Sequence, residues 1–234
     1  MNDSGISLYL IPTVLAEGTQ NAVLTPQIRE VIGNLDIFLV ENVRTARRFI
    51  SSLKLGKVID DLTFIELDKD TPEAATAAAL KSLKSSAGII SEAGCPGIAD
   101  PGAVAVRIAH QRGIKVVPLV GPSSILLALM GSGMSGQSFA FHGYLPIDKA
   151  ARKKALQNLE RNARQLLQTQ IFMETPFRNE QLFEAVLEAC APDTLLCIAA
   201  NVTAIDEMIK TMTVKNWKSA KPDLHKKPSI FLIG

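Results

Sequence analysis

The sequence predicts an α/β protein of two α/β domains, with mostly parallel or mixed sheets and a cleft between the domains. In the first half, short apolar runs alternate with helical patterns, as in a parallel sheet that helices cover on both faces. A second alternating series follows a stiff stretch with two prolines at residues 118–122. The length of 234 residues accommodates two such domains. We therefore expect an N-terminal domain over residues 1–118 and a C-terminal domain over residues 119–234.

The elements of the first domain follow from its apolar runs and from the residues that bound them. Pro12 ends the first apolar run. Thr25 and Thr71 stand where N-caps are expected, and each is followed by a proline at the first helical position. The predicted strands cover residues 7–11, 36–40, 87–90 and 114–117, and the predicted helices cover residues 26–32, 45–53, 72–84 and 102–112.

The same kinds of pattern continue through the second domain. A helix is expected over residues 123–130, and the turn-rich segment 131–136 follows it with three glycines. Further strands are predicted over residues 139–141, 170–174, 194–199 and 229–233, and further helices over residues 149–163 and 176–189.

Two loops rich in glycine and proline follow strands of the first domain. Residues 91–102 come directly after the strand at 87–90 and contain three glycines and two prolines. Residues 118–124 follow the next strand along the chain. Such stiff turns let a ligand approach the bare backbone, and ligands of open α/β sheets bind at the carboxyl ends of strands. We expect these loops to lie at adjacent strand ends and to form one binding site.

Composition and motifs disfavour several other classes of protein. The net charge of +2 gives no overall attraction to nucleic acid, and no apolar run approaches the roughly 20 residues of a membrane span. Cys95, Cys190 and Cys197 form no Cys-x-x-Cys pair and the histidines no metal-ligand set, so we expect no metal and a cytoplasmic location. Dinucleotide-binding, phosphate-loop and serine-hydrolase motifs are absent, which disfavours hydride transfer and hydrolysis.

Four segments together resemble the tetrapyrrole methylase superfamily: residues 8–13, 41–44, 91–102 and 116–124. They are most similar to the ribosomal RNA small subunit methyltransferase I branch, in order and spacing, over nearly the whole chain. The resemblance implies a homodimeric methyltransferase whose donor, S-adenosylmethionine, binds in the interdomain cleft, so that the C-terminal domain completes the donor site. The acceptor that it implies is a ribose 2′-hydroxyl of ribosomal RNA in the small ribosomal subunit.

The resemblance also assigns donor contacts to positions in this chain. The backbone groups of the glycine-rich turns suit the polar parts of S-adenosylmethionine, while Ile98 and Met173 suit its adenine. Nothing near Cys95 in the sequence activates a thiolate, so that residue is interpreted as a small packing residue. The matching positions are Glu92, Ala93, Gly94, Cys95, Ile98, Ser123, Ser124, Met173, Ala199, Ala200 and Pro228.

The segments expected to face the acceptor depart further from the family pattern than the donor loops do. The family's Glu-Asp-Thr-Arg reads Glu41-Asn42-Val43-Arg44 here, which removes one carboxylate, and residues 12–18 and 199–204 also differ. Two alternatives therefore stay open. One is the same chemistry on a tetrapyrrole or another small molecule, and the other is a homologue that binds the donor or RNA without turnover.

A hydroxyl acceptor needs a general base, and two carboxylates expected at strand ends are candidates. The sequence does not choose between Glu41 and Glu174. Arg44 is a third catalytic candidate, although it could simply pair with Glu41. A basic stretch at helical spacing is either a solvated face or a surface that contacts RNA phosphates. It consists of Lys149, Arg152, Lys153, Lys154, Arg161 and Arg164.

Overall fold

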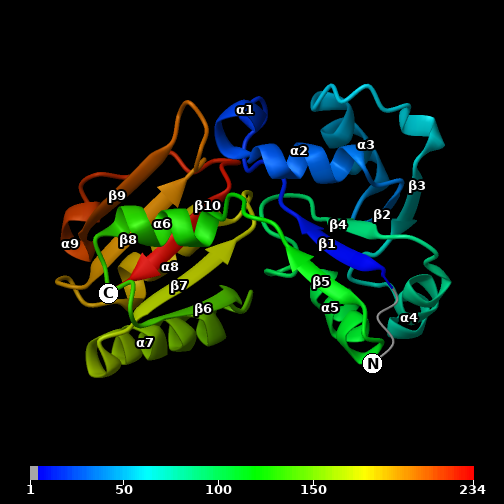
Figure 1. The fold of residues 1–234 in the computed structure, drawn as a ribbon. Coiled ribbons are helices and arrows are strands. Elements are labelled where there is room, and N and C mark those ends of the chain that lie inside the picture. The colour runs from blue at the N-terminus through cyan, green and yellow to red at the C-terminus, as the bar shows by residue number, and fades with distance from the viewer. Residues whose placement is uncertain (1–4) are drawn as a thin grey trace. The chain divides into compact units, whose positions relative to one another are not determined.

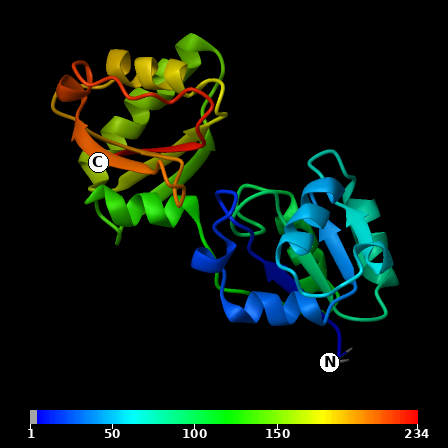
Figure 2. The same ribbon diagram turned by 90° about the horizontal axis from the view of Figure 1, so that it is seen from above.

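The computed structural model describes residues 5–234, which fold as two compact units. Unit 1 ends at Ser123 and unit 2 begins at Ser124, whereas the sequence pattern had suggested a division between residues 118 and 119. Each unit is an open sheet with helices on both of its faces (Figures 1 and 2). The predicted α/β class, with one parallel and one mixed sheet, is therefore confirmed.

The sheet of unit 1 is fully parallel, with the strand order β3-β2-β4-β1-β5. Its strands are β1 (Ser7–Ile11), β2 (Ile37–Val40), β3 (Thr63–Glu66), β4 (Ala87–Ile90) and β5 (Lys115–Pro118). Its helices are α1 (Gln20–Val23), α2 (Pro26–Gly33), α3 (Val43–Ser52), α4 (Glu73–Ser82) and α5 (Gly102–Gln111), with a 3-10 turn at Ile59–Asp61.

The helices of unit 1 divide between the two faces because side chains alternate along each strand. Phe38 and Val40 of β2 pack into one core with Ile28 of α2 and Ile50 of α3. The intervening Leu39 points into a second core, which α4 and α5 cover. The inner strands β1, β2 and β4 read as continuous apolar runs, which is why they could be predicted. The edge strand β5 was predicted from Val116 and Val117, although both of its ends are exposed.

The sheet of unit 2 is mixed, with the order β6-β7-β10-β8-β9. Strands β6 and β7 are parallel, and every other neighbouring pair is antiparallel. Helices α7 to α9 share a large core on one face, whereas α6 contacts β8, β9 and β10. The elements are α6 (Ser124–Ser132), β6 (Phe139–Tyr144), α7 (Lys149–Leu166), β7 (Thr169–Glu174), α8 (Asn179–Ala189), β8 (Leu195–Ala200), β9 (Met208–Thr213), α9 (Val214–Trp217) and β10 (Ser229–Ile233).

Several local expectations need correction. The sequence did not predict β3 and β9, two edge strands whose residues are mostly half-buried or exposed and carry no unbroken apolar run. Thr71 does not cap α4, because its hydroxyl donates to Asp68 Oδ1 at 2.6 Å and the N-cap position falls on Pro72. Helix α3 begins two residues before its expected start, since Asn42 supplies the N-cap and accepts from the backbone N–H of Thr45 at 3.2 Å.

Candidate functional site

The two glycine-rich loops meet at the carboxyl edge of the parallel sheet. They do not lie at adjacent strand ends as expected, because β1 is inserted between β4 and β5. The segment after β1 joins them instead: the backbone N–H of Thr13 donates to the carbonyl oxygen of Gly94 at 2.9 Å. Across the edge, the Cys95 thiol donates to the carbonyl oxygen of Pro122 at 3.3 Å. The structure therefore brings the two loops together in unit 1, with the segment after β1 beside them.

Two glycines are required for this close approach. Gly94 has φ +74°, and a Cβ there would lie 3.2 Å from Leu15 and 3.4 Å from the carbonyl oxygen of Pro122. A Cβ at Gly121 would collide with the ring of Pro12, which precedes the loop after β1. The loops thus interlock through their backbones and leave little room for side chains at the points of contact.

A single carboxylate orders the second half of the loop at 91–102. Asp100 Oδ1 accepts hydrogen bonds from the backbone N–H groups of Gly97 at 2.8 Å and Gly102 at 2.7 Å. The second bond lies at the first residue of α5, so the loop and the helix are fixed by the same side chain. Burial raises the pKa of Asp100, although both hydrogen bonds oppose that effect.

Glu41 directly follows β2, as expected, and faces the same loop. Its Oε2 accepts from the backbone N–H of Glu92 at 3.3 Å. Burial raises the pKa of Glu41, and the negative charges of Asp100, Glu92 and Asp68 raise it further against the hydrogen bond from Glu92. Arg44 does not offset these negative charges by pairing with Glu41, because it is exposed and forms no ion pair within residues 5–234. The alternative that Glu41 and Arg44 pair with each other is therefore wrong.

A cleft of about 380 Å³ opens beside Glu92 and Ala93. One wall is the loop after β1, the other is one face of α3, and the floor is the end of β4 with the start of its loop. The sequence did not predict this cleft. The α3 residues that line it recur at intervals of three and four residues. This spacing predicts that they share one face of the helix, but it does not predict which segment packs opposite that face. They are Thr45, Arg48, Phe49 and Ser52, which Ala46 accompanies.

The predicted donor positions in unit 1 differ in what they expose. Ile98 is 54% exposed and Ala93 is also exposed, so both present apolar surface that an adenosyl group could cover. The Glu92 carboxylate accepts a hydrogen bond from the hydroxyl of Thr45. Cys95 is half-buried, and burial raises the pKa of its thiol, which agrees with a packing residue rather than a nucleophile. The residues present fit the polar and apolar parts of S-adenosylmethionine.

The predicted donor positions in unit 2 gather at one end of its sheet. Ile230 pairs with both Met173 and Ala199, so these three residues form a row across β7, β10 and β8. Ala199 and Ala200 are both buried, and Ala200 belongs to the core under α7 and α8. Pro228 precedes β10 at the same end, where its carbonyl oxygen accepts from the backbone N–H of Asn201 at 2.9 Å.

Glu174 ends β7, as expected, but its carboxylate is engaged. The side chain is 1% exposed, and Oε1 accepts from Arg178 at 2.7 Å and from the backbone N–H of Thr175 at 2.7 Å. These bonds hold the carboxylate at the turn between β7 and α8. Glu174 is therefore committed to contacts within unit 2 and is almost completely buried.

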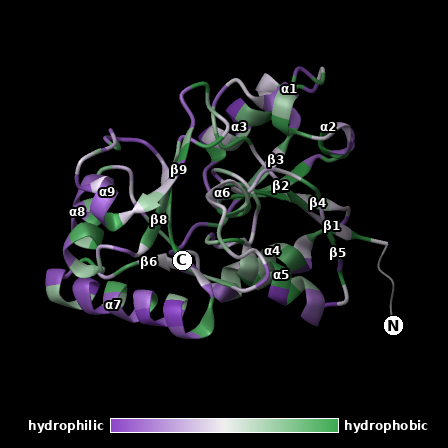
Figure 3. Cartoon of the chain, turned by 90° about the vertical axis from the view of Figure 1, so that its left-hand side faces the viewer, coloured by the Kyte–Doolittle hydropathy of each residue, from purple (hydrophilic) through white to green (hydrophobic). Residues whose placement is uncertain are grey.

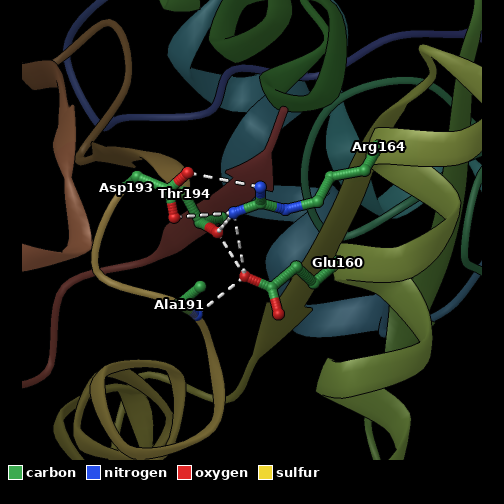
Figure 4. Close-up of polar contacts among 5 residues, drawn as sticks. All are labelled: Glu160, Arg164, Ala191, Asp193 and Thr194. Carbon is green, nitrogen blue, oxygen red and sulfur yellow. Dashed lines mark hydrogen bonds and ion pairs between the residues drawn. The ribbon is translucent and has the colours of Figure 1, made fainter.

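The basic stretch of α7 divides into structural and free charges. Arg164 bonds Asp193 at 2.8 Å and the hydroxyl of Thr194 at 2.9 Å, beside Glu160 (Figure 4). Arg152 is buried, and Lys149 lies 3.5 Å from Glu188. The remaining charges keep much of α7 hydrophilic (Figure 3). The lysines at 153 and 154 form no ion pair in the part of the chain that the structure describes.

Comparison with curated proteins finds relatives along nearly the whole chain. Ribosomal RNA small subunit methyltransferase I of Vibrio cholerae is 31% identical over 229 residues, which cover 97% of this chain and 76% of that protein. The chain belongs to the ribosomal RNA small subunit methyltransferase I family. The proteins of that name from Haemophilus influenzae and Bacillus subtilis are 28% and 32% identical, over 100% and 80% of this chain and 80% and 60% of their own lengths. No family model matches the chain.

Solved structures agree with this family at the level of fold. The methyltransferase CobJ superposes with a TM-score of 0.64 at 16% identity, over 98% of this chain and 94% of that chain. Uroporphyrin III C-methyl transferase from Thermus thermophilus gives 0.59 at 14% identity, over 97% of both chains. The fold expected from the resemblance to tetrapyrrole methylases is confirmed. As a member of the ribosomal RNA small subunit methyltransferase I family, the chain is an S-adenosylmethionine-dependent methyltransferase.

Within residues 5–234, no helix combines the length and the apolar character that a membrane span requires. The same residues include no group of three or more His, Cys, Asp or Glu side chains arranged to hold a metal ion.

Proposed function

We propose that the chain transfers a methyl group to a ribose 2′-hydroxyl of small-subunit ribosomal RNA. The observation that carries the proposal is the 31% identity over 97% of the chain with a ribosomal RNA small subunit methyltransferase I. The interlocked loops at the carboxyl edge of unit 1 support it, because they present the exposed residues Ala93 and Ile98 at the usual ligand position of a parallel sheet.

Donor binding is assigned to two groups of residues. In unit 1, the backbone of the loop at 91–102 and the exposed side chain of Ile98 would hold the donor, together with Ser123. In unit 2, the family pattern assigns donor contacts to Ser124 and to the end of the sheet, at Met173, Ala199, Ala200 and Pro228. The second assignment rests on the family pattern and on the gathering of these residues within unit 2.

Glu41 is assigned the role of general base. When bound, S-adenosylmethionine would supply the methyl group, and the electron pair of the broken C–S bond would stay on its sulfur. Glu41 takes up the proton of the acceptor hydroxyl as the oxygen forms its bond to the methyl carbon. Burial raises the pKa of Glu41, which makes its carboxylate a stronger base than an unperturbed one and suits this step.

The choice of Glu41 over Glu174 follows from their hydrogen bonds. Glu174 is almost completely buried and bonded to Arg178 and Thr175, whereas Glu41 is half-buried and accepts one bond, from Glu92. Glu41 also lies beside a proposed donor loop, because that bond comes from the loop's own backbone. We assign Arg44 to phosphate contacts near this residue rather than to proton transfer.

The proposal includes a homodimer in the cytoplasm that acts on the small ribosomal subunit or on its RNA. These assignments come from the family pattern and are tested separately from catalysis. Light scattering behind a sizing column should give twice the monomer mass of 25.2 kDa.

Methyl transfer is tested with labelled S-adenosylmethionine and small ribosomal subunits from cells that lack the gene. We expect label in the RNA and a single 2′-O-methylated nucleoside after digestion. Naked small-subunit RNA and a tetrapyrrole serve as the other acceptors. Donor binding by calorimetry without label in any acceptor would support a homologue without turnover and would contradict the proposal.

A further inference from the structure

The cleft of unit 1 is built from one face of α3 and the loop after β1. Residues Thr45, Arg48, Phe49 and Ser52 recur at helical spacing along α3 and line one wall. The loop at residues 13–20 lines the other with apolar and polar groups. The volume of about 380 Å³ lies in the range of small-molecule sites and is large enough for one nucleotide.

The electrostatics of α3 favour an anionic ligand. The helix carries three arginines and no acidic residue, and its N-terminal end adds the positive pole of the helix dipole. Arg47 is engaged with Asp60 and lies over the ring of Phe64, at 5.7 Å from its centroid. Arg44 and Arg48 remain at the surface, so the helix presents two guanidinium groups that its own fold does not bury.

A weak ion pair spans the two walls of the cleft. Arg48 of α3 lies 3.4 Å from Glu17 of the loop after β1, and their side chains are 66% and 93% exposed. Both residues line the cleft. So exposed a pair contributes little to folding and can exchange for a better partner. A phosphate group is such a partner, because it accepts two parallel hydrogen bonds from one guanidinium.

We propose that this cleft receives one nucleotide of the acceptor RNA, with Arg48 on its phosphate and Phe49 against its base. In the absence of RNA, Glu17 holds Arg48, and the incoming phosphate displaces that carboxylate. The inference rests on the proposed function and locates the acceptor within unit 1. The cleft is flanked by Glu92, whose backbone N–H is bonded to Glu41, so the nucleotide would lie next to the proposed base.

Two substitutions with opposite expected signs test the proposal. The probe is a short fluorescent single-stranded oligoribonucleotide, titrated against the full chain in saturating S-adenosylhomocysteine. Arg48→Gln should weaken binding about tenfold and lower the salt slope by about one phosphate. Glu17→Gln should strengthen binding severalfold, because it frees Arg48. Arg112→Gln, at the exposed end of α5, is the matched control and should change neither quantity.

Phe49→Leu keeps an apolar wall and removes the ring. It should weaken binding of the oligoribonucleotide and leave the affinity for S-adenosylhomocysteine, measured by calorimetry, unchanged. Unchanged RNA affinity in Arg48→Gln, while the wild type still methylates RNA, would overturn this inference and leave the proposed function standing. Loss of S-adenosylhomocysteine binding in folded Phe49→Leu would also overturn it, because the cleft would then hold the donor. Failure of the wild type to methylate RNA would overturn the proposed function itself.

Discussion

The backbone N–H of Thr13 donates a hydrogen bond to the carbonyl oxygen of Gly94, at an N···O distance of 2.9 Å. This bond ties the segment after β1 to the loop after β4, and it places β1 at the centre of the candidate site. Because Gly94 has a positive φ and Pro122 lies across from it, the same residue fixes both glycine-rich loops. The loops therefore act as one rigid surface at the edge of unit 1.

Gly94→Ala should disrupt this surface. Its left-handed backbone costs an alanine about 1–2 kcal/mol, and the added methyl must displace Leu15 or Pro122. We expect a lower free energy of unfolding in urea and at least tenfold weaker binding of S-adenosylhomocysteine. Gly113→Ala is the matched control, with φ +69° and no atom within 4 Å of the new methyl. Equal donor affinity in the two variants would contradict a role for the 91–102 loop.

Glu41→Gln should separate catalysis from stability. Without its base the enzyme should lose about 10²- to 10⁴-fold in methyl transfer. Since burial raises the pKa of Glu41 above 4.5, the folded state binds this proton more tightly than the unfolded chain does. As pH rises from the unfolded to the folded pKa of Glu41, the carboxyl therefore lowers the unfolding free energy of the wild type. The lower value persists at neutral pH.

The glutamine variant should accordingly be at least as stable as the wild type at neutral pH, and should lose this advantage below the unfolded pKa. Urea unfolding between about pH 4 and pH 8 measures the effect. Glu66→Gln, at the exposed end of β3, is the control and should keep full activity. Full activity in Glu41→Gln would remove this residue from the mechanism.

Glu174→Gln should act on the stability of unit 2 rather than on proton transfer. The change removes the charge that Arg178 and the backbone N–H of Thr175 share, at a side chain that is 1% exposed. We expect a loss of about 1–3 kcal/mol in unfolding free energy. Arg107→Gln, which breaks an exposed pair with Glu73, should cost less. A large fall in kcat of the folded Glu174→Gln enzyme would show that the base has been misassigned.

Substitutions of the basic residues of α7 should have different effects, depending on whether the residue forms an ion pair within the fold. Arg164→Gln should lower the melting temperature, because Arg164 connects α7 to Asp193 and Thr194. Lys153→Gln with Lys154→Gln should leave the melting temperature unchanged and lower the salt slope of RNA binding by no more than about two. A salt slope unchanged by the lysine pair would make this part of α7 a solvated face, and would not affect the cleft in unit 1.

The class of fold and the two glycine-rich loops were predictable because each depends on residues that are close together in the sequence. Strands buried on both faces produce unbroken apolar runs, and Gly94 and Pro122 mark the points where backbones must approach. The insertion of β1 between β4 and β5 has no local signal, since strand order depends on crossovers between distant segments. The edge strands β3 and β9 were missed because polar residues interrupt their apolar ones, so that neither contains more than two apolar residues in a row.

The cleft could not be predicted either, because its two walls come from segments that are separate in the sequence. Arg48 and Phe49 recur with Thr45 at helical spacing, which predicts a shared face but not the loop that faces it. Asn42 illustrates the converse, because the loss of a family carboxylate at that position leaves the N-cap of α3 intact through the amide oxygen. The effect of a sequence departure therefore depends on what the side chain at that position contacts.

A crystal structure of the protein with S-adenosylhomocysteine tests the central claim most directly. The account predicts that the ligand lies against the backbone of residues 92–95 and the side chain of Ile98, with Ser123 in contact and the cleft at Phe49 still open. A ligand seated between Phe49 and the loop at residues 13–20, or one that leaves residues 92–98 untouched, would contradict it.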